Sequence, residues 1–134
     1  MLVVKYKNDI CQMAAHNDKG KQGEELALET ILAKGYSVLH TNWRFQKTEV
    51  DIIAKIGNTL VFLEVKTRSS DYFGLPESFV TEAKKRSFGR ASEAYCQLNQ
   101  LNDADIRYDI MAVIINKKTQ VVQHFEDAFF PEFL

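Results

Sequence analysis

The sequence predicts one α/β domain in which a central mixed sheet is flanked by two long helices, in the order αβββαββ. Three observations lead to this fold class. An apolar stripe at helical spacing comes first, three β-type runs follow it, and a second helical stripe precedes two further β-type runs. With 134 residues and 46% hydrophobic content, the chain can bury one compact core.

The first helix is expected over residues 21–34. Ala27, Leu28 and Ile31 recur there at helical spacing, and Gly35 follows as a C-cap. Three strands are expected next, over residues 36–41, 49–55 and 59–67. The dipeptide Gly57-Asn58 has the chemistry of a tight turn, so the second and third strands are predicted to form a hairpin.

The second helix is expected over residues 77–99, after a loop that contains Gly74 and Pro76. Two final strands are predicted at residues 106–115 and 119–125, and the aromatic tail after them is expected to pack against the core. The apolar face of this second helix comprises Val80, Phe88, Ala91, Tyr95 and Leu98.

Composition narrows the classes of function. The apolar runs are far shorter than the roughly 20 residues of a membrane helix, so no membrane association is expected. The N-terminus lacks the pattern of a secretion signal, and Cys11 and Cys96 are best interpreted as free thiols, which together favour the cytoplasm. A net charge of −1 argues against coating nucleic acid through bulk electrostatics, so any such contact must be local.

Several catalytic classes lack support. The three histidines have no metal-ligand spacing with one another or with the cysteines, which disfavours a zinc site or Cys/His catalysis. The chain contains no phosphate-binding Gly-rich loop, no dinucleotide-binding fingerprint and no serine-hydrolase elbow. Arg107 and Asp109 are expected to share a strand face and to pair with each other.

Carboxylates are predicted to meet at one end of the hairpin. The segment 60–66 is apolar on both faces until Glu64 and Lys66, which is typical of a central strand whose charges lie at the rim of the core. A hairpin that turns at Gly57-Asn58 brings Asp51 beside Glu64. Two such carboxylates would bind Mg²⁺ or Mn²⁺ through oxygen, and Lys66 could orient the attacking water.

Each of these residues also has a plainer interpretation. An isolated Glu-x-Lys is commonly an exposed strand pair. Glu24 lies within the apolar stripe of the first helix, whereas Glu25 and Glu29 fall off its centre. The alternative role of Glu24, nearly as well supported by the local sequence, is to cap the helix N-terminus and compensate the helix dipole. Lys84 lies beside Phe88 and could reach a substrate phosphate or simply extend to solvent, as most such lysines do.

A set of motifs in consistent order and spacing, from about Met13 to Phe130, resembles the bacterial YraN-like family. These motifs are Gly20-Lys-Gln-Gly-Glu-Glu-Leu-Ala27, Gly35-Tyr36, Asn42-Trp-Arg44, Glu49-Val-Asp-Ile-Ile-Ala54, Phe62-Leu-Glu-Val-Lys-Thr-Arg68, Phe73-Gly74, Lys84 and Arg107-Tyr-Asp109. The family is assigned to the restriction-endonuclease-like nuclease superfamily and is similar to archaeal Holliday junction resolvases.

The resemblance implies a restriction-endonuclease-like sandwich with Asp51, Glu64 and Glu24 as metal ligands and Lys66 as the catalytic lysine. Thr48 departs from the family pattern, in which Gly often precedes Glu-x-Asp. The resemblance also places the usual start near Met13, so residues 1–12 are expected to be an extension and 13–134 the domain.

Three functions remain open at this point. The first is a metal-dependent endonuclease for branched or otherwise structured DNA. In this function Lys84, Lys85 and Arg68 would bind the substrate, and a homodimer would enlarge the contact surface. The second is a nucleic-acid-binding module with an inactive site. The third is an adaptor in a DNA repair or processing complex.

Overall fold

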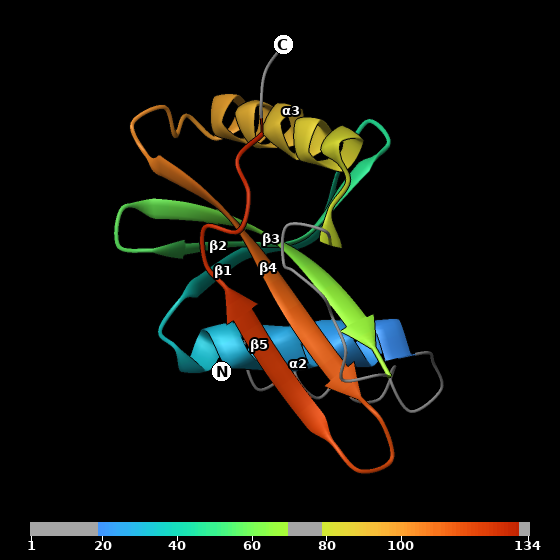
Figure 1. Cartoon of the computed structure of the whole chain (residues 1–134). Helices are drawn as coiled ribbons and strands as arrows, with labels where there is room; N and C mark the ends of the chain where they lie inside the picture. The colour runs from blue at the N-terminus through green and yellow to red at the C-terminus, as the bar shows by residue number, and fades with distance from the viewer. Residues whose placement is uncertain (1–18, 70–78, 132–134) are drawn as a thin grey trace.

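The computed structural model describes residues 19–69 and 79–131 of the chain (Figure 1). The expected extension over residues 1–12, the start near Met13 and the loop with Gly74 and Pro76 lie outside these residues. The element order within them is αβββαββ, as predicted. The elements are α2 (Lys19–Ala33), β1 (Ser37–Phe45), β2 (Thr48–Ile56), β3 (Thr59–Arg68), α3 (Glu82–Leu98), β4 (Asp105–Ile115) and β5 (Gln120–Phe125).

The five strands form one sheet in the order β1-β2-β3-β4-β5. The β3–β4 pair is parallel and the other three pairs are antiparallel, so the predicted mixed sheet is confirmed. Helix α2 covers one face of the sheet and α3 covers the other (Figure 1). Because α3 connects the two parallel strands, it supplies the crossover that such a pair requires.

Alternation along β3 divides the core into two clusters. Phe62 packs with Phe88 on the α3 side, whereas Leu63 packs with Ile31 on the α2 side. All of these side chains are at most 1% exposed. The prediction that β3 is a central strand buried on both faces is therefore confirmed.

Two element boundaries differ from the predicted ones by more than two residues. Helix α3 begins at Glu82 rather than at residue 77 because Thr81, in an extended conformation, is its N-cap and accepts a hydrogen bond from the Lys84 amide at 3.1 Å. Strand β1 continues to Phe45, beyond the predicted residue 41, although Asn42 within it has a φ of 51°.

The C-terminal segment packs as predicted at one of its aromatic residues. Phe129 is 6% exposed and contacts Phe88 and Tyr108, whereas Phe130 is 72% exposed. Neither helix in the described part of the chain has the length and apolarity that crossing a bilayer requires.

Candidate metal centre

The two central carboxylates of the candidate centre lie where β2 parts from β3. The antiparallel register runs from Ile56 opposite Thr59 to Ile52 opposite Leu63, so Asp51 and Glu64 come next on their strands. There the Asp51 side chain replaces a backbone partner, because its Oδ2 accepts a hydrogen bond of 2.8 Å from the amide of Val65. The hairpin predicted from Gly57-Asn58 thus brings the two acidic residues together.

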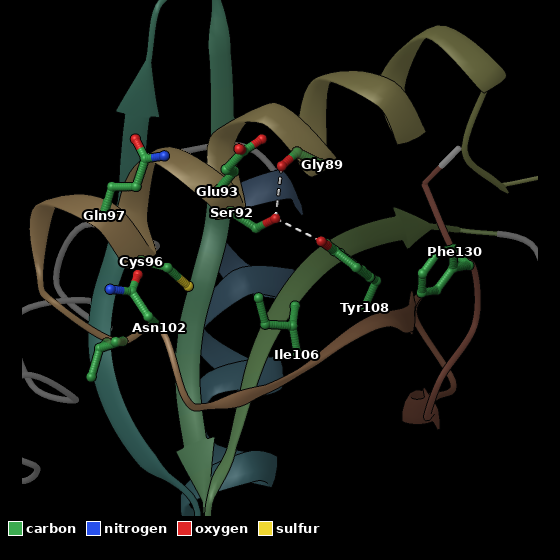
Figure 2. Close-up of a pocket in the computed structure, with 10 residues that line it drawn as sticks. Gly89, Ser92, Glu93, Cys96, Gln97, Asn102, Ile106, Tyr108 and Phe130 are labelled. Carbon is green, nitrogen blue, oxygen red and sulfur yellow. Dashed lines mark hydrogen bonds between the residues drawn. The ribbon is translucent and has the colours of Figure 1, made fainter. Parts of the chain in front are cut away.

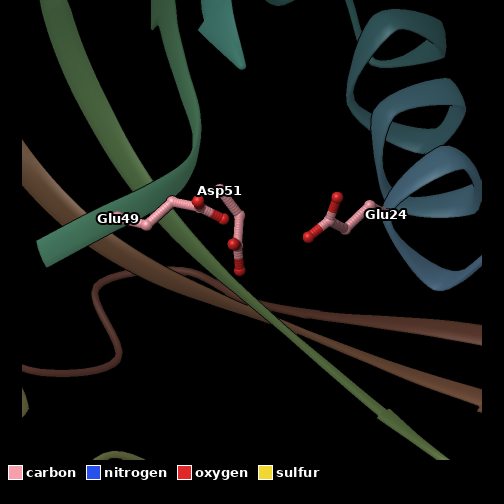
Figure 3. A group of neighbouring side chains, drawn as sticks. All are labelled: Glu24, Glu49 and Asp51. Atoms are coloured by element: carbon pink, nitrogen blue, oxygen red, sulfur yellow. The ribbon is translucent and has the colours of Figure 1, made fainter. Parts of the chain in front are cut away.

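Helix α2 and strand β2 contribute two further carboxylates. Side-chain oxygens of Glu24, Glu49 and Asp51 lie within 4.8 Å of one another. In Figure 3, Glu24 extends from the helix toward Glu49 and Asp51 on the strand. This spacing is compatible with several oxygens that share one cation.

Glu64 is the most buried acid of the centre, at 6% exposed. Its Oε1 lies 3.6 Å from Nζ of Lys66 and its Oε2 lies 3.7 Å from Nζ of Lys84. Among the described residues, Glu64 Oε2 is the buried side-chain oxygen that has no hydrogen-bond partner. Two ammonium groups therefore stand near Glu64 without satisfying its carboxylate.

The electrostatic cost of this arrangement appears in the pKa values. Burial, together with the charge of Glu64, raises the pKa of Asp51 to about 8, against the opposing effects of the Val65 amide and Lys84. Burial also raises the pKa of Glu64, although Lys84 and Lys66 oppose the shift. The pKa of Glu24 is raised by burial and by Glu49, whereas the hydrogen bond from Asn42 lowers it. Acids this close favour protonation unless a cation joins them.

Of the three cationic residues predicted to contact substrate, only Lys84 lies at the carboxylates. Its Nζ also lies 5.5 Å from the centre of the Phe88 ring, which confirms the predicted neighbourhood on the helix. Lys85 instead pairs with Glu82 in its own helix at 3.0 Å. Arg68 is exposed and donates a hydrogen bond of 3.0 Å to the backbone oxygen of Thr67.

Two residues of this region were missed by sequence reasoning, and one was misplaced. Glu49 lies two positions before Asp51 on the same strand, so strand alternation could have identified it. Asn42, whose Nδ2 donates to Glu24 and Glu49, depends on the β1 register, which the sequence does not reveal. Glu25 was expected off the apolar stripe but is 6% exposed, whereas Glu24 is half-buried, because α2 rotates its buried face toward Gly23 and Glu25.

A second polar cluster, which we call the Asp109 network, lies on the α2 side of β4. Arg107 donates to both carboxylate oxygens of Asp109 at 2.9 Å, which confirms their predicted pairing. The Asp109 Oδ2 also lies 2.7 Å from Nε2 of His124, and Oδ1 accepts a hydrogen bond from the Asp127 amide at 2.9 Å. Burial acts to raise the pKa of Asp109, but the bonds from His124 and Arg107 outweigh it and hold that pKa below its usual value.

A cavity of about 670 Å³ lies between α3 and the start of β4 (Figure 2). Ser92 and Tyr108 line it and share a buried hydrogen bond of 2.6 Å, and the exposed Phe130 borders it. None of the carboxylates of the candidate centre contributes to its walls. The cavity and the candidate centre are therefore separate features.

Comparisons with known proteins agree with the motifs. The model of the uncharacterised protein family UPF0102 matches residues 23–113. A UPF0102 protein of Flavobacterium psychrophilum is 52% identical over 118 residues, which cover 88% of this chain and 98% of the relative. One from Phocaeicola vulgatus is 41% identical over 89% of this chain and 98% of its own, and one from Caldicellulosiruptor saccharolyticus is 44% identical over 77% and 87%. The chain therefore belongs to the UPF0102 family, which confirms the YraN-like resemblance of its motifs.

Proposed function

We propose that this protein is a metal-dependent phosphodiester hydrolase whose centre comprises Glu24, Asp51, Glu64 and Lys66, joined by Glu49. The observation that carries the proposal is the meeting of carboxylates from α2, β2 and β3 beside the lysine of β3. Buried acids that repel one another are unfavourable as a purely structural arrangement. They suit a site whose missing charge is supplied by a cation.

The residues present fit Mg²⁺ or Mn²⁺. All the donors are carboxylate oxygens, which hard divalent cations prefer, and Glu64 Oε2 is buried without a hydrogen-bond partner among the described residues. Asp51 and Glu64, together with Glu24 and Glu49, are the residues that would hold the ion. When bound, the ion would supply an activated water and neutralise charge on the phosphate.

The remaining chemistry falls to two lysines. Lys66, next to Glu64 on the same face of β3, would orient the attacking water and stabilise the charge that develops on the phosphate. Lys84, which reaches the same carboxylate from α3, would contact the substrate phosphate. Since Lys66 needs only to position and polarise water, the proposed reaction requires no covalent intermediate.

The substrate we propose is DNA with a branch or a flap. Because the net charge is −1, long-range attraction to a plain duplex is weak and binding must depend on local contacts. Lys84 is the cation best placed for this, and a homodimer would double such contacts. A junction brings the phosphates of several arms close together, so one small surface can contact more of them than on a linear duplex.

The test is a cleavage assay on branched, flapped, single-stranded and duplex DNA and on RNA, with Mg²⁺, with Mn²⁺ and without metal. The proposal expects metal-dependent cleavage that Lys66→Ala abolishes. Lys55→Ala, which removes an exposed lysine elsewhere in the β2–β3 hairpin, is the matched control and should cleave like the native chain. Equal cleavage by the Lys66→Ala variant would contradict the proposed role of Lys66.

The near-neutral charge counts against strong binding of a plain duplex, which leaves two inactive alternatives: a nucleic-acid-binding module that relies on local contacts, or an adaptor in a DNA repair or processing complex. The same assay separates these alternatives. Binding that Lys66→Ala retains, with no cleavage of any substrate, supports the module. Absence of binding to every nucleic acid supports the adaptor.

A further inference from the structure

Asn42 occupies an unusual position in β1. Its φ of 51° falls in the left-handed region, which a residue other than glycine adopts only at a cost. In the register of β1 with β2, Asn42 and Asp51 lie between the pairs Thr41–Ile52 and Trp43–Val50. The residue with the left-handed conformation, Asn42, thus lies directly beside Asp51 of the candidate centre.

The side chain of Asn42 joins two acids from different elements. Its Nδ2 donates to Glu24 Oε2 of α2 at 3.3 Å and to Glu49 Oε1 of β2 at 3.2 Å. Only the amide nitrogen can face two carboxylates, because the amide oxygen would repel both. The other oxygen of Glu49, Oε2, lies 2.9 Å from Nη2 of the exposed Arg44, so Glu49 is held from two sides.

We propose that Asn42 is a positioning residue that holds Glu24 and Glu49 at the spacing of a divalent cation before the cation binds. This inference rests on the proposed function, since it assumes that the same carboxylates are the metal ligands.

The physical reason is the repulsion between these acids. Side-chain oxygens of Glu24, Glu49 and Asp51 lie within 4.8 Å of one another, so their negative charges repel, and the side chains of Glu24 and Glu49 are long enough to rotate toward solvent. The neutral Asn42 amide, which donates to both acids, reduces that repulsion and leaves the position of the cation free. A Lys or Arg side chain would occupy that position with its own charge. Each carboxylate oxygen that accepts from Asn42 keeps a second lone pair for a metal.

The acidic cluster is not the sole indication of a cation here. Glu64, 6% exposed, has an oxygen without a hydrogen-bond partner among the described residues, and it lies beside Asp51 at the end of the β2–β3 register. It therefore approaches the same group of acids from β3. Asn42 organises the α2 and β2 side of that group.

The experiment is a titration of the full chain with Mn²⁺ to millimolar concentration, in which EPR counts the free ion. Asn42→Gly removes both donors but accepts the same φ without strain. Gln46→Gly is the matched control, because Gln46 has a φ of 56° at an exposed position and no contact with the carboxylates appears in the structure. Urea unfolding without metal is measured for both variants.

The proposal expects Asn42→Gly to weaken Mn²⁺ binding roughly tenfold, within the range known for residues that orient metal ligands. Gln46→Gly should bind like the native chain, and neither variant should unfold more easily. In a Glu49→Gln background, the effect of Asn42→Gly should shrink, since one of its two acceptors has lost its charge.

Two outcomes would overturn this role, and they are distinguishable. If Asn42→Gly bound Mn²⁺ with native affinity, or if both glycine variants weakened Mn²⁺ binding equally, Asn42 would serve only to adopt the left-handed backbone conformation. The proposed function would then stand without this role for Asn42. A native chain that does not bind Mn²⁺ would remove the inference and the metal centre together.

Discussion

Asp51 on β2 and Asp109 on β4 belong to the same sheet, and burial acts to raise the pKa of both, yet their pKa values shift in opposite directions. Asp109 receives two hydrogen bonds from Arg107, one from His124 and one from the Asp127 amide. Asp51 receives a hydrogen bond from the Val65 amide and otherwise faces acids, with Lys84 as a more distant cation. Burial is common to the two sites, so the partners decide the difference.

The comparison separates a structural cluster from a candidate functional one. In the Asp109 network, each carboxylate oxygen of Asp109 accepts two hydrogen bonds. Nε2 of His124 must carry the proton, because the carboxylate can only accept, and Nδ1 then accepts from the Lys34 ammonium at 2.8 Å. In the candidate metal centre, four carboxylates face three cationic side chains, and Glu64 Oε2 has no hydrogen-bond partner among the described residues. The first arrangement is complete without a ligand, whereas the second would become favourable if a cation were added, as we propose.

The largest expected effect on stability comes from removing the central acceptor of the Asp109 network. Asp109→Ala leaves Arg107 and His124 without their shared acceptor, so the free energy of unfolding should fall by about 3–5 kcal/mol, the usual cost of breaking a buried pair from one side. Urea denaturation at pH 7 measures this. A loss below about 1 kcal/mol would show that the network is not structural. Mn²⁺ affinity, measured where the variant remains folded, should be unchanged.

The next effect concerns the contact that places Glu24. A Cβ at Gly23 of α2 would collide with the side chain of Thr67 on β3, whose own Cβ is 3.0 Å away. Gly23→Ala should therefore push the helix from the sheet, lower the free energy of unfolding by about 2 kcal/mol and weaken Mn²⁺ binding. Thr67→Ala should restore part of both losses. The exposed Gly20→Ala in the same helix is the control, and a matching effect there would refute the packing explanation.

The third effect gives the sign of the pH dependence. Because the pKa of Asp51 rises from 3.8 to about 8 on folding, the metal-free native state binds the extra proton, and its stability should decrease as pH rises from 4 to 8. Asp51→Asn removes this dependence, so its stability relative to the native chain should increase steadily as the pH rises from 4 to 8. The exposed Asp105→Asn serves as the control. Parallel curves for native and Asp51→Asn would contradict the account.

The smallest effect is expected at the rim of the Asp109 network. Lys34 is exposed, and its hydrogen bond to His124 is one that water can replace. Lys34→Met should change the free energy of unfolding by less than about 0.5 kcal/mol. Thermal denaturation of Lys34→Met and Asp109→Ala side by side shows whether the stability resides in the buried part of the network, as proposed.

Much of the fold followed from periodicity, because the alternation in β3 and most positions of the two helical stripes report burial. Leu98 is an exception, since it was predicted on the apolar face of the second helix but is 72% exposed at the end of α3. The Gly57-Asn58 turn also fixed the register that places Asp51 beside Glu64. Features that depend on contacts distant in sequence did not follow. Asn42 reaches the acids only through the pairing of β1 with β2, and the burial of Glu25 depends on how α2 rotates against the sheet. His124 joins Asp109 only because β5 lies beside β4.

The most direct test of the central claim is a crystal of the native chain soaked with millimolar Mn²⁺ and a short DNA phosphodiester, with data collected at the manganese absorption edge. The account predicts an anomalous peak between Asp51 and Glu64, with an oxygen of Glu24 or Glu49 and a phosphate oxygen among the ligands, and no peak in Asp51→Ala, Glu64→Ala crystals. A native crystal without a peak at the carboxylates, or a Mn²⁺ ion bound elsewhere while Lys84 stays at Glu64, would contradict it.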